Sequence, residues 1–342
     1  MAHNELLEKL YQAQPLTQEE SYHLFTSVVQ GKLSPEQLAG GLMALKVRGE
    51  NIDEVAGAVK AIQENAQAFP IPDYPFADIV GTGGDGANTI NISTATSLIC
   101  GSLSEKTGSK IAKHGNQGVT SKSGSSDVLT ALGVNVNCSP ATARKALDEI
   151  GICFLFAQQY HQGYKHAMPV RRALKTATIF NNLGPLINPA RPKRQLLGVS
   201  TPQLIDMYAQ TAVALGHEHS LVVHGVGADG AVVDEVALHG VTQVAEIENG
   251  KINHYQVTPT DFGFSEQPLS VLEGGTPQEN AQAIINLLKG EGNIYHAQAV
   301  AINVAMALKL FGYDDLKQSV NMVMEHLASG QAMETLEKLR AY

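Results

Sequence analysis

The residues best suited to chemistry lie between Asp78 and Thr94, where the chain reads D-I-V-G-T-G-G-D-G-A-N-T-I-N-I-S-T. The stretch starts as a short apolar run, continues through four glycines and ends before a helix-like segment at residues 95–103. Glycine lets a backbone adopt positive φ and approach a ligand closely, and a helix N-terminus offers unpaired N–H groups at the positive end of its dipole. A phosphate is the ligand that such a loop suits best. A tight turn that binds nothing is the alternative, but this stretch is more polar than a turn requires.

Neither common phosphate-binding fingerprint fits this loop. A P-loop needs a lysine after its glycines, and none follows Gly86 directly. Gly81, Gly83 and Gly86 have the G-x-G-x-x-G spacing of dinucleotide-binding loops. That motif also needs an acidic residue about twenty positions later, and Glu105 lies in what reads as the end of a helix. Dinucleotide binding therefore stays a minor alternative.

A second polar loop covers residues 113–127 and joins a predicted strand to a predicted helix. Lys113 and Lys122 could offset the charge of a phosphate, while hydroxyls and backbone N–H groups supply the geometry. The alternative is a flexible loop with solvated lysines, but irregular loops of this length are uncommon in compact domains unless they are functional.

A pair of adjacent carboxylates, Asp234 and Glu235, follows an apolar run further along the chain. Beside two phosphate-binding loops, these side chains would repel the ligand unless a cation lay between them. Carboxylate oxygens suit magnesium, which keeps several waters and bridges to substrate phosphates. An exposed Asp-Glu pair is common, so the magnesium interpretation depends on the two loops.

The composition argues against several classes of protein. The 342 residues carry a formal net charge of −9, which argues against a nucleic-acid-binding face. Three cysteines far apart in the sequence indicate neither a disulfide framework nor a zinc site. No apolar stretch is long enough to span a membrane, and the N-terminus lacks the features of a signal peptide. We therefore expect a cytoplasmic protein that binds neither nucleic acid nor membranes.

Helices alone are expected in residues 1–70. Thr17 and Ser34 each begin a capping box, and Asn51 opens a further helix. A proline-rich stretch at residues 69–75 marks a boundary, after which strands and helices alternate. We expect strands at residues 77–80, 110–113, 152–157, 195–199, 220–224 and 232–238, and helices that begin at Ser93-Thr94, Ser125-Ser126, Ser139-Pro140, Thr201-Pro202 and Thr276-Pro277.

This alternation predicts an α/β protein with two domains. Residues 1–70 form a small helical domain, completed by about 161–190, and residues 75–342 form a large domain with a mostly parallel central sheet flanked by helices. Asn249 and Gly250 predict a hairpin between residues 244–247 and 252–257. Pro169 predicts a kinked or broken helix at residues 164–174.

Six short segments are informative in combination. They are G-T-G-G-D at residues 81–85, N-I-S-T at 91–94, K-H-G-N at 113–116, S-G-S-S-D at 123–127, F-N-N-L-G-P-L-I-N-P at 180–189 and D-E at 234–235. Together they resemble the anthranilate phosphoribosyltransferase family of tryptophan biosynthesis. The likeness runs from the N-terminal helices to the C-terminal tail and is greatest for the enterobacterial-type enzymes.

The resemblance implies a fold of the nucleoside phosphorylase and phosphoribosyltransferase type and a reaction. Phosphoribosyl pyrophosphate (PRPP) and anthranilate would give N-(5-phosphoribosyl)anthranilate and pyrophosphate. The residues that would bind PRPP are Gly81, Gly84, Asp85, Thr89, Asn91, Ile92, Ser93, Thr94, Lys113, His114, Gly115, Asn116, Gln117, Gly118, Val119, Thr120, Ser121 and Ser125. Those that would bind anthranilate are Gly81, Asn116 and Arg171, with His114 as a wall of that site. Ser93, Asp234 and Glu235 would hold magnesium, two ions per active site.

The implied chemistry is physically coherent. A leaving pyrophosphate gains negative charge while the ribose becomes oxocarbenium-like, so magnesium and N–H donors beside the leaving group stabilise the transition state. An aromatic amine is already neutral at pH 7 and needs orientation more than deprotonation. We therefore expect no catalytic acid or base.

The resemblance also has an implication for the oligomeric state, and two other functions are alternatives. The resemblance implies a homodimer formed through the N-terminal helices. One alternative function is that of an enzyme like pyrimidine nucleoside phosphorylase. The other is that of a non-catalytic paralogue that binds a phosphorylated metabolite or nucleic acid.

Four features depart from the family pattern. Gln117 stands where arginine is usual, Gln158 where proline is common, and Asn182 where an apolar residue is usual. The link from residue 226 to residue 233 is also longer than usual. Because an arginine charge is missing beside the PRPP loop, PRPP affinity is the property in which we expect the chain to differ most.

Overall fold

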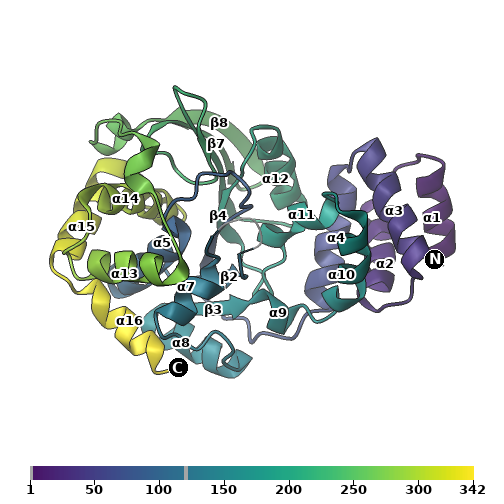
Figure 1. Ribbon diagram of the computed structural model, residues 1–342, viewed down its shortest axis with the longest axis horizontal. Coiled ribbons are helices and arrows are strands. Elements are labelled where there is room, and N and C mark those ends of the chain that lie inside the picture. The colour runs from purple at the N-terminus through teal and green to yellow at the C-terminus, as the bar shows by residue number, and fades with distance from the viewer. Residues whose placement is uncertain (1–2, 119–121) are drawn as a thin grey trace.

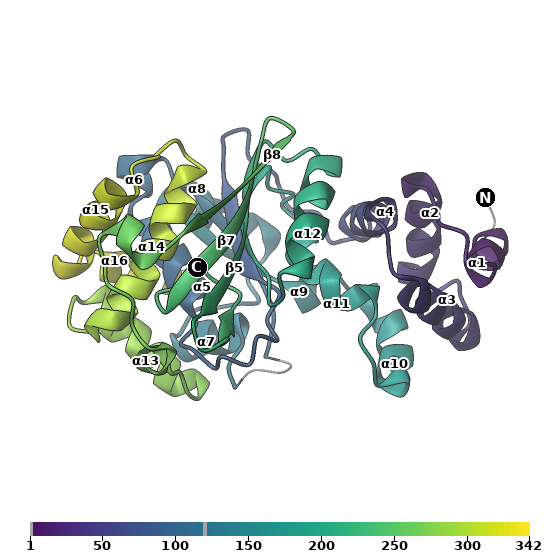
Figure 2. The same ribbon diagram turned by 90° about the horizontal axis from the view of Figure 1, so that it is seen from above.

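The computed structural model describes residues 3–118 and 122–342. A bundle of helices at the N-terminal end stands beside a sheet that is covered by helices (Figure 1). Figure 2 shows α12 (Gln203–Ala214) on one side of that sheet and the C-terminal helices on the other. None of the helices in the described part of the chain is long and apolar enough to cross a membrane.

The bundle consists of α1 (His3–Tyr11), α2 (Gln18–Val29), α3 (Pro35–Arg48) and α4 (Ile52–Glu64). Thr17, Ser34 and Asn51 each form a capping box, in which the side chains of the cap and of a residue three positions later satisfy free backbone N–H groups. The expectation of helices without strands in residues 1–70 is confirmed for the described part of the chain.

The sheet has the order β3 (Ile152–Phe156), β2 (Ile111–Gly115), β1 (Ala77–Gly81), β4 (Arg194–Gly198), β5 (His219–Gly227), β7 (Gly240–Glu248) and β8 (Lys251–Val257). The pairs from β3 to β5 are parallel, and β7 and β8 are antiparallel additions. The predicted fold class, an α/β protein with a mostly parallel sheet, is confirmed.

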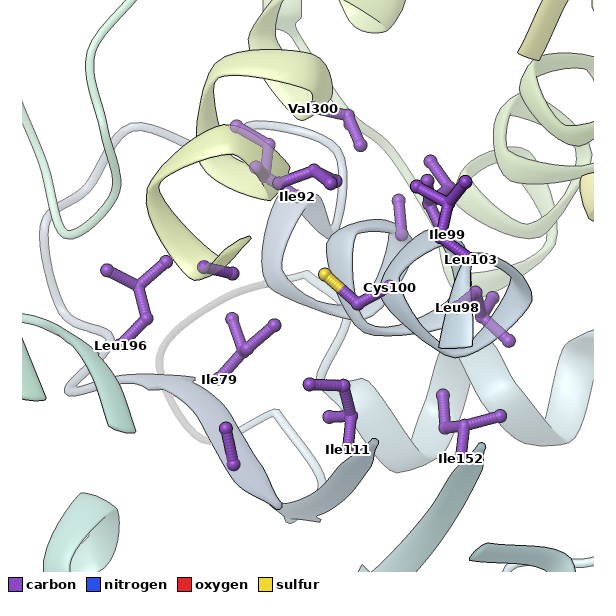
Figure 3. Close-up of a cluster of buried hydrophobic side chains, with 14 of the residues drawn as sticks. Ile79, Ile92, Leu98, Ile99, Cys100, Leu103, Ile111, Ile152, Leu196 and Val300 are labelled. Carbon is purple, nitrogen blue, oxygen red and sulfur yellow. The ribbon is translucent and has the colours of Figure 1, made fainter. Parts of the chain in front are cut away.

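Alternate residues of the strands face two separate cores. Leu196 of β4 packs toward α5 (Ile92–Ser102) and α14 (Ile294–Lys309), whereas the adjacent Leu197 belongs to the cluster that joins α12 to the bundle. Figure 3 shows the first core, in which Ile79, Ile111 and Ile152 lie below the α5 side chains. The sheet is therefore anchored on both faces, which fixes the positions of its strand ends.

The remaining helices complete the two outer layers. They are α6 (Ser104–Thr107), α7 (Ser125–Ala131), α8 (Pro140–Ile150), α9 (Ala157–Tyr160), α10 (Tyr164–Leu174), α11 (Ile179–Leu183), α13 (Pro277–Leu288), α15 (Leu316–Ala328), α16 (Ala332–Arg340) and the 3₁₀ turns Gly184–Leu186, Pro259–Phe262 and Leu269–Leu272. Ala167 and Val170 of α10 belong to the buried cluster of the bundle, in line with the expectation that about 161–190 complete the helical domain. The domain boundaries themselves stay a prediction.

The strand expected at residues 232–238 is wrong in length. Only β6 (Val232–Val233) forms, and it pairs antiparallel with β5. Beyond it, the Val236 N–H group donates to Asn303 Oδ1 at 2.9 Å and the Ala237 N–H group to Thr242 Oγ1 at 2.8 Å. Because side chains satisfy these donors, the apolar run does not need a strand partner.

Local expectations elsewhere had mixed outcomes. Asn249 and Gly250 connect β7 to β8 with φ values of 50° and 77°, so the predicted hairpin is confirmed. The helix α10 continues through Pro169 without a break. The helix expected to have Pro202 at its first position begins at Gln203 instead, with Pro202 as its cap.

Glu246 of β7 supplies a pH-dependent contribution to the stability of this sheet. It lies 2.8 Å from His219 Nε2 and 3.5 Å from Lys309 Nζ. The hydrogen bond from His219 is the largest cause that lowers the pKa of Glu246 to about 2. A carboxyl with a lowered pKa adds stability above its unfolded pKa and loses it as the pH falls toward the folded value.

We expect Glu246→Gln to reduce the free energy of unfolding by about 1–2 kcal/mol at pH 7, after allowance for solvent screening. The reduction should shrink as the pH falls from about 4.5 toward the folded pKa. Urea denaturation at a series of pH values measures this difference, and the exposed Glu248→Gln on the same strand is the control. A loss that does not change with pH would contradict the assignment.

Candidate active site

The glycine-rich loop begins at the C-terminal end of β1, between the ends of β2 and β4. Gly83, Gly84 and Gly86 have φ values of 66°, 79° and 75°, which residues with a side chain rarely adopt. The Gly83 N–H group donates to Asp234 Oδ2 at 2.6 Å. The loop therefore needs glycine for its conformation, and it lies against the carboxylate pair.

Asp234 lies directly beyond the end of β4 because β5 is longer than β4. The extra residues of β5 pair with β6, which therefore continues the line of β4. A Cβ atom on Gly198, the last residue of β4, would come within 1.6 Å of the Asp234 carbonyl oxygen, and one on Gly81 within 2.2 Å of Oδ2. Asp234 is thus held between two strand ends that have room only for glycine.

Glu235 lies at the N-terminus of α5, where the Ser93 N–H group donates to its Oε1 at 3.0 Å. The cap residue Asn91 does not cap the helix with its side chain. Its Nδ2 donates to the Ser123 carbonyl oxygen at 3.1 Å, and its Oδ1 accepts from Asn280 Nδ2 at 2.8 Å. Asn91 thus ties α5 to the second loop and leaves the positive end of the helix to an anion.

Lys113 of β2 is a buried cation, only 2% exposed. Its Nζ donates to a carbonyl oxygen of β1 at 2.6 Å and to Ser93 Oγ at 3.3 Å. Burial lowers the pKa of Lys113, and the charges of Asp78, Glu235 and Asp234 oppose that effect. Lys113 therefore offsets the charge of these carboxylates from within the protein.

Asp78 of β1 is fully buried behind the site. It accepts a hydrogen bond from the His114 N–H group at 3.1 Å and one from Asn188 Nδ2 at 2.9 Å. Burial raises the pKa of Asp78 to about 6, against the opposing charge of Lys113. Asp78 thus connects β2 to the motif at residues 180–189, a role that no spacing in the sequence indicated.

The Asp234–Glu235 pair carries more negative charge than its protein partners neutralise. Burial and the charge of Asp85, whose Oδ2 accepts from the Asp234 N–H group at 3.3 Å, raise the pKa of Asp234 to about 7. Burial and the charge of Asp234 raise the pKa of Glu235 well above its usual value. A bound cation would relieve this repulsion.

The donor set fits magnesium better than a metal held by protein alone. In residues 3–118 and 122–342, no group of three or more His, Cys, Asp or Glu side chains is arranged to hold a metal ion. Magnesium commonly takes one or two carboxylates and completes its shell with waters and substrate phosphates. The pair next to a phosphate-type loop has this composition.

The second loop folds back onto the start of α7. The Asn116 carbonyl oxygen accepts from the Ser126 N–H group at 3.2 Å and from Ser125 Oγ at 3.3 Å. Asp127 Oδ2 accepts from the N–H groups of Gly118 and Gly124, both at 2.9 Å. The predicted PRPP residues Val119, Thr120 and Ser121 lie outside the described residues.

Three other predicted PRPP residues lie close to the glycine loop. Thr89 forms an isolated bridge with Glu273. Ile92 and Thr94 are 3% and 1% exposed, and Ile92 belongs to the hydrophobic core around α5.

Arg171 of α10 is a half-buried cation without an acidic partner in the described structure. Its guanidinium carbon lies 5.3 Å from the centre of the Phe180 ring, and its Nη1 lies 3.6 Å from Met168 Sδ. Burial lowers the pKa of Arg171. A planar guanidinium in this setting favours a carboxylate ligand that it can bind with two hydrogen bonds.

An aromatic cluster connects the end of β2 to α10. The ring centroids of His114 and His161 are 5.2 Å apart, those of His161 and Tyr164 are 5.9 Å apart, and those of Tyr164 and Phe180 are 5.2 Å apart. Burial lowers the pKa of His114 well below its usual value and that of His161 to about 4, so both rings are neutral at pH 7.

Sequence reasoning did not identify His161 and Tyr164 as site residues. No motif marks them, because they approach His114 only where the chain crosses from β3 to α10. The single local signal for them was the expectation that the chain returns to the helical domain at about residue 161.

Comparisons with known proteins agree with this geometry. Residues 4–66 match the helical bundle domain of the glycosyl transferase family, and residues 73–333 match its a/b domain. The fold and the site therefore define a glycosyl transferase of this two-domain class.

More specific similarity extends over the whole chain. This chain is 63% identical to anthranilate phosphoribosyltransferase of Haemophilus influenzae over 342 residues, which is 100% of both chains. The Pasteurella multocida enzyme of that name is 58% identical with the same coverage. The chain belongs to the anthranilate phosphoribosyltransferase family, as its sequence motifs predicted.

Solved structures bear the same name. That of the Thermus thermophilus enzyme is 38% identical, with a TM-score of 0.90 and coverage of 98% of both chains. That of the Saccharomyces cerevisiae enzyme, described in complex with PRPP and Mg, is 28% identical, with a TM-score of 0.87 and coverage of 99% of this chain and 97% of that one. A further structure of the yeast enzyme is in complex with 4-fluoroanthranilate.

Proposed function

We propose that this chain transfers the phosphoribosyl group of PRPP to the amine of anthranilate, giving N-(5-phosphoribosyl)anthranilate and pyrophosphate. The observation that carries the proposal is the Asp234–Glu235 pair, which is held against a glycine-rich loop and the N-terminus of α5. Arg171 lies on a separate element and has no acidic partner among the described residues, so it supplies a second site for a carboxylate. The family relationship makes the two alternatives, a nucleoside phosphorylase and a non-catalytic paralogue, less favourable.

In this proposal the backbone carries most of the PRPP binding. The glycine loop presents the N–H groups of residues 84–86, since those of Thr82 and Gly83 donate to Gly198 and Asp234. The first turn of α5 adds its dipole. Asn91 and Asp127 hold the second loop in place through hydrogen bonds to its backbone. These fixed donors face a leaving pyrophosphate without having to reorganise as its charge develops.

Ser93, Asp234 and Glu235 would hold magnesium, two ions per active site. Bound magnesium would neutralise the charge that develops on the pyrophosphate. Lys113 lies behind these carboxylates, and its charge opposes the rise in the pKa of Glu235. A bound cation would lower the pKa of both carboxyls further and favour their ionised forms as ligands.

Gly198→Ala tests whether the end of β4 positions Asp234. The new Cβ atom would overlap the Asp234 carbonyl oxygen. We expect the Tm to fall by several degrees, as about 1–3 kcal/mol of overpacking implies, and the increase in Tm caused by magnesium and PRPP to disappear.

The control for Gly198→Ala is Leu196→Val, a core change in the same strand. It should lower the Tm comparably and keep the increase caused by magnesium and PRPP. Thermal unfolding with and without the ligands separates the two variants. An increase that persists in Gly198→Ala would contradict the role of β4.

Anthranilate would be bound through its carboxylate by Arg171 and Asn116, with the Gly81 backbone fixing its amine. The neutral rings of His114 and His161 would form an uncharged wall. None of these groups is placed to act as a strong base, which fits an amine that is neutral at pH 7 and needs only orientation.

To test the proposal, the purified protein is mixed with anthranilate, PRPP and magnesium, and the fluorescence of anthranilate is followed. We expect anthranilate to be consumed only when all components are present. A folded protein that produces no phosphoribosyl-anthranilate would overturn the proposal.

The assembly and location of the protein are also proposals. We propose a homodimer formed through the N-terminal helices, which is supported by the exposure of Tyr11 and Val47 on α1 and α3. We also propose a cytoplasmic location and the domain division at residues 1–70 and 75–342. Sedimentation of the intact protein measures the first of these.

A further inference from the structure

The single turn α9 between β3 and His161 carries a contact that the proposed reaction does not yet explain. Gln158 on this turn donates from Nε2 to Gln117 Oε1 at 3.0 Å and to Asn116 Oδ1 at 3.4 Å. The Gln117 N–H group donates to the same Asn116 Oδ1 at 2.9 Å. One amide NH₂ group of α9 therefore bridges two consecutive residues of the second loop.

This arrangement determines which end of the Asn116 amide is free. Two donors surround Oδ1, whereas Nδ2 makes no hydrogen bond to the described residues. A side-chain amide can reverse by rotation about its last bond, and the two orientations differ only in their hydrogen bonds. The pair of donors thus favours the orientation in which Nδ2 is available to a ligand.

The two glutamines are complementary to each other. Gln117 supplies the acceptor and Gln158 the donor of their bond. Arginine at position 117 would have no acceptor and proline at position 158 would have no side-chain donor. The two departures from the family pattern at these positions are therefore partners in one interaction.

We propose that Gln158 is a positioning residue that holds the Asn116 amide with Nδ2 directed at the carboxylate of anthranilate. The inference rests on the proposed function, in which Asn116 binds anthranilate. Gln158 itself does not contact the substrate. Its effect should therefore be confined to anthranilate binding and should require Asn116.

Two substitutions of Gln158 separate this role from simple packing. Gln158→Met removes the donor that Gln158 supplies and leaves the Gln117 N–H group in place. We expect the KM for anthranilate to rise about fivefold, the equivalent of one neutral hydrogen bond. Gln158→Glu replaces the donor by an acceptor of nearly the same shape. The carboxylate would attract Asn116 Nδ2 and turn Oδ1 toward the substrate carboxylate, so we expect a rise of about twentyfold or more.

The readouts are the KM for anthranilate, kcat, and the Kd for anthranilate from calorimetry with PRPP and magnesium present. We expect kcat to change by less than about threefold in both variants, because the group acts on binding. Gln162→Glu is the matched control, since it adds the same charge to an exposed residue of the same segment. It should leave the KM for anthranilate unchanged.

The dependence on Asn116 is tested in a double variant. In Asn116→Ala, the further change Gln158→Glu should have no additional effect on anthranilate binding. Equal effects of Gln158→Glu and Gln162→Glu, a smaller effect of Gln158→Glu than of Gln158→Met, or additivity with Asn116→Ala would each overturn the inference. Absence of turnover in the unmodified protein would instead overturn the proposed function.

Discussion

Glu235→Gln should lower kcat/KM for PRPP by about 10²–10³-fold, the magnitude typical of losing one electrostatic contact with the transition state. Glutamine keeps the shape of the side chain, and its Oε1 can still accept from the Ser93 N–H group. What the variant loses is the charge that would hold magnesium against the leaving pyrophosphate. Steady-state kinetics over a range of magnesium concentrations measures the effect.

The same variant should be at least as stable as the unmodified protein when magnesium is absent. The pKa of Glu235 is raised well above its usual value, so the folded state favours the protonated form and ionisation destabilises it near pH 7. Glutamine removes that cost. A Tm that falls in the absence of metal, or activity that is retained with its magnesium dependence unchanged, would contradict this account of the site.

Arg171→Ala should raise the KM for anthranilate about 10²-fold and the KM for PRPP by less than about threefold, because two charge-assisted hydrogen bonds to the anthranilate carboxylate are lost. The KM of Arg171→Lys for anthranilate should lie between those of the unmodified protein and of Arg171→Ala, since lysine keeps the charge but not the planar pair of donors. Varying each substrate at saturating concentrations of the other gives both constants.

The Tm of Arg171→Ala is the control for its effect on anthranilate binding. Its guanidinium packs on Phe180 and has no acidic partner in the described structure. Removing it should therefore change the Tm little. A larger effect on the KM for PRPP than on that for anthranilate would reject the assigned role.

Features set by nearby residues were predictable from the sequence. The capping boxes at Thr17 and Ser34, and the hairpin at Asn249 and Gly250, depend on residues within one turn of each other. The glycine loop was equally recognisable, since three of its glycines adopt positive φ. Family motifs strengthened the grouping of Asp234 and Glu235 with that loop, because a carboxylate pair is a weak signal by itself.

Features set by distant contacts were not predictable. The apolar run after residue 232 reads as a strand, but Asn303 and Thr242 take up the donors that a strand partner would have satisfied. Lys113 reads as a lysine that offsets the charge of a phosphate, yet the packing of β1 and β2 buries it. His161 and Tyr164 join the site only through the crossing to α10.

The antiparallel pairing of β6 with β5 also explains how the chain accommodates the link from residue 226 to residue 233 next to the proposed magnesium site. Ala228, Asp229 and Gly230 form an exposed tip, closed by a hydrogen bond from the Gly227 N–H group to the Ala231 carbonyl oxygen at 2.8 Å. Additional residues at this tip leave the register of β6, and hence the position of Asp234, unchanged. The tip is therefore the place at which a peptide tag could be inserted without loss of activity.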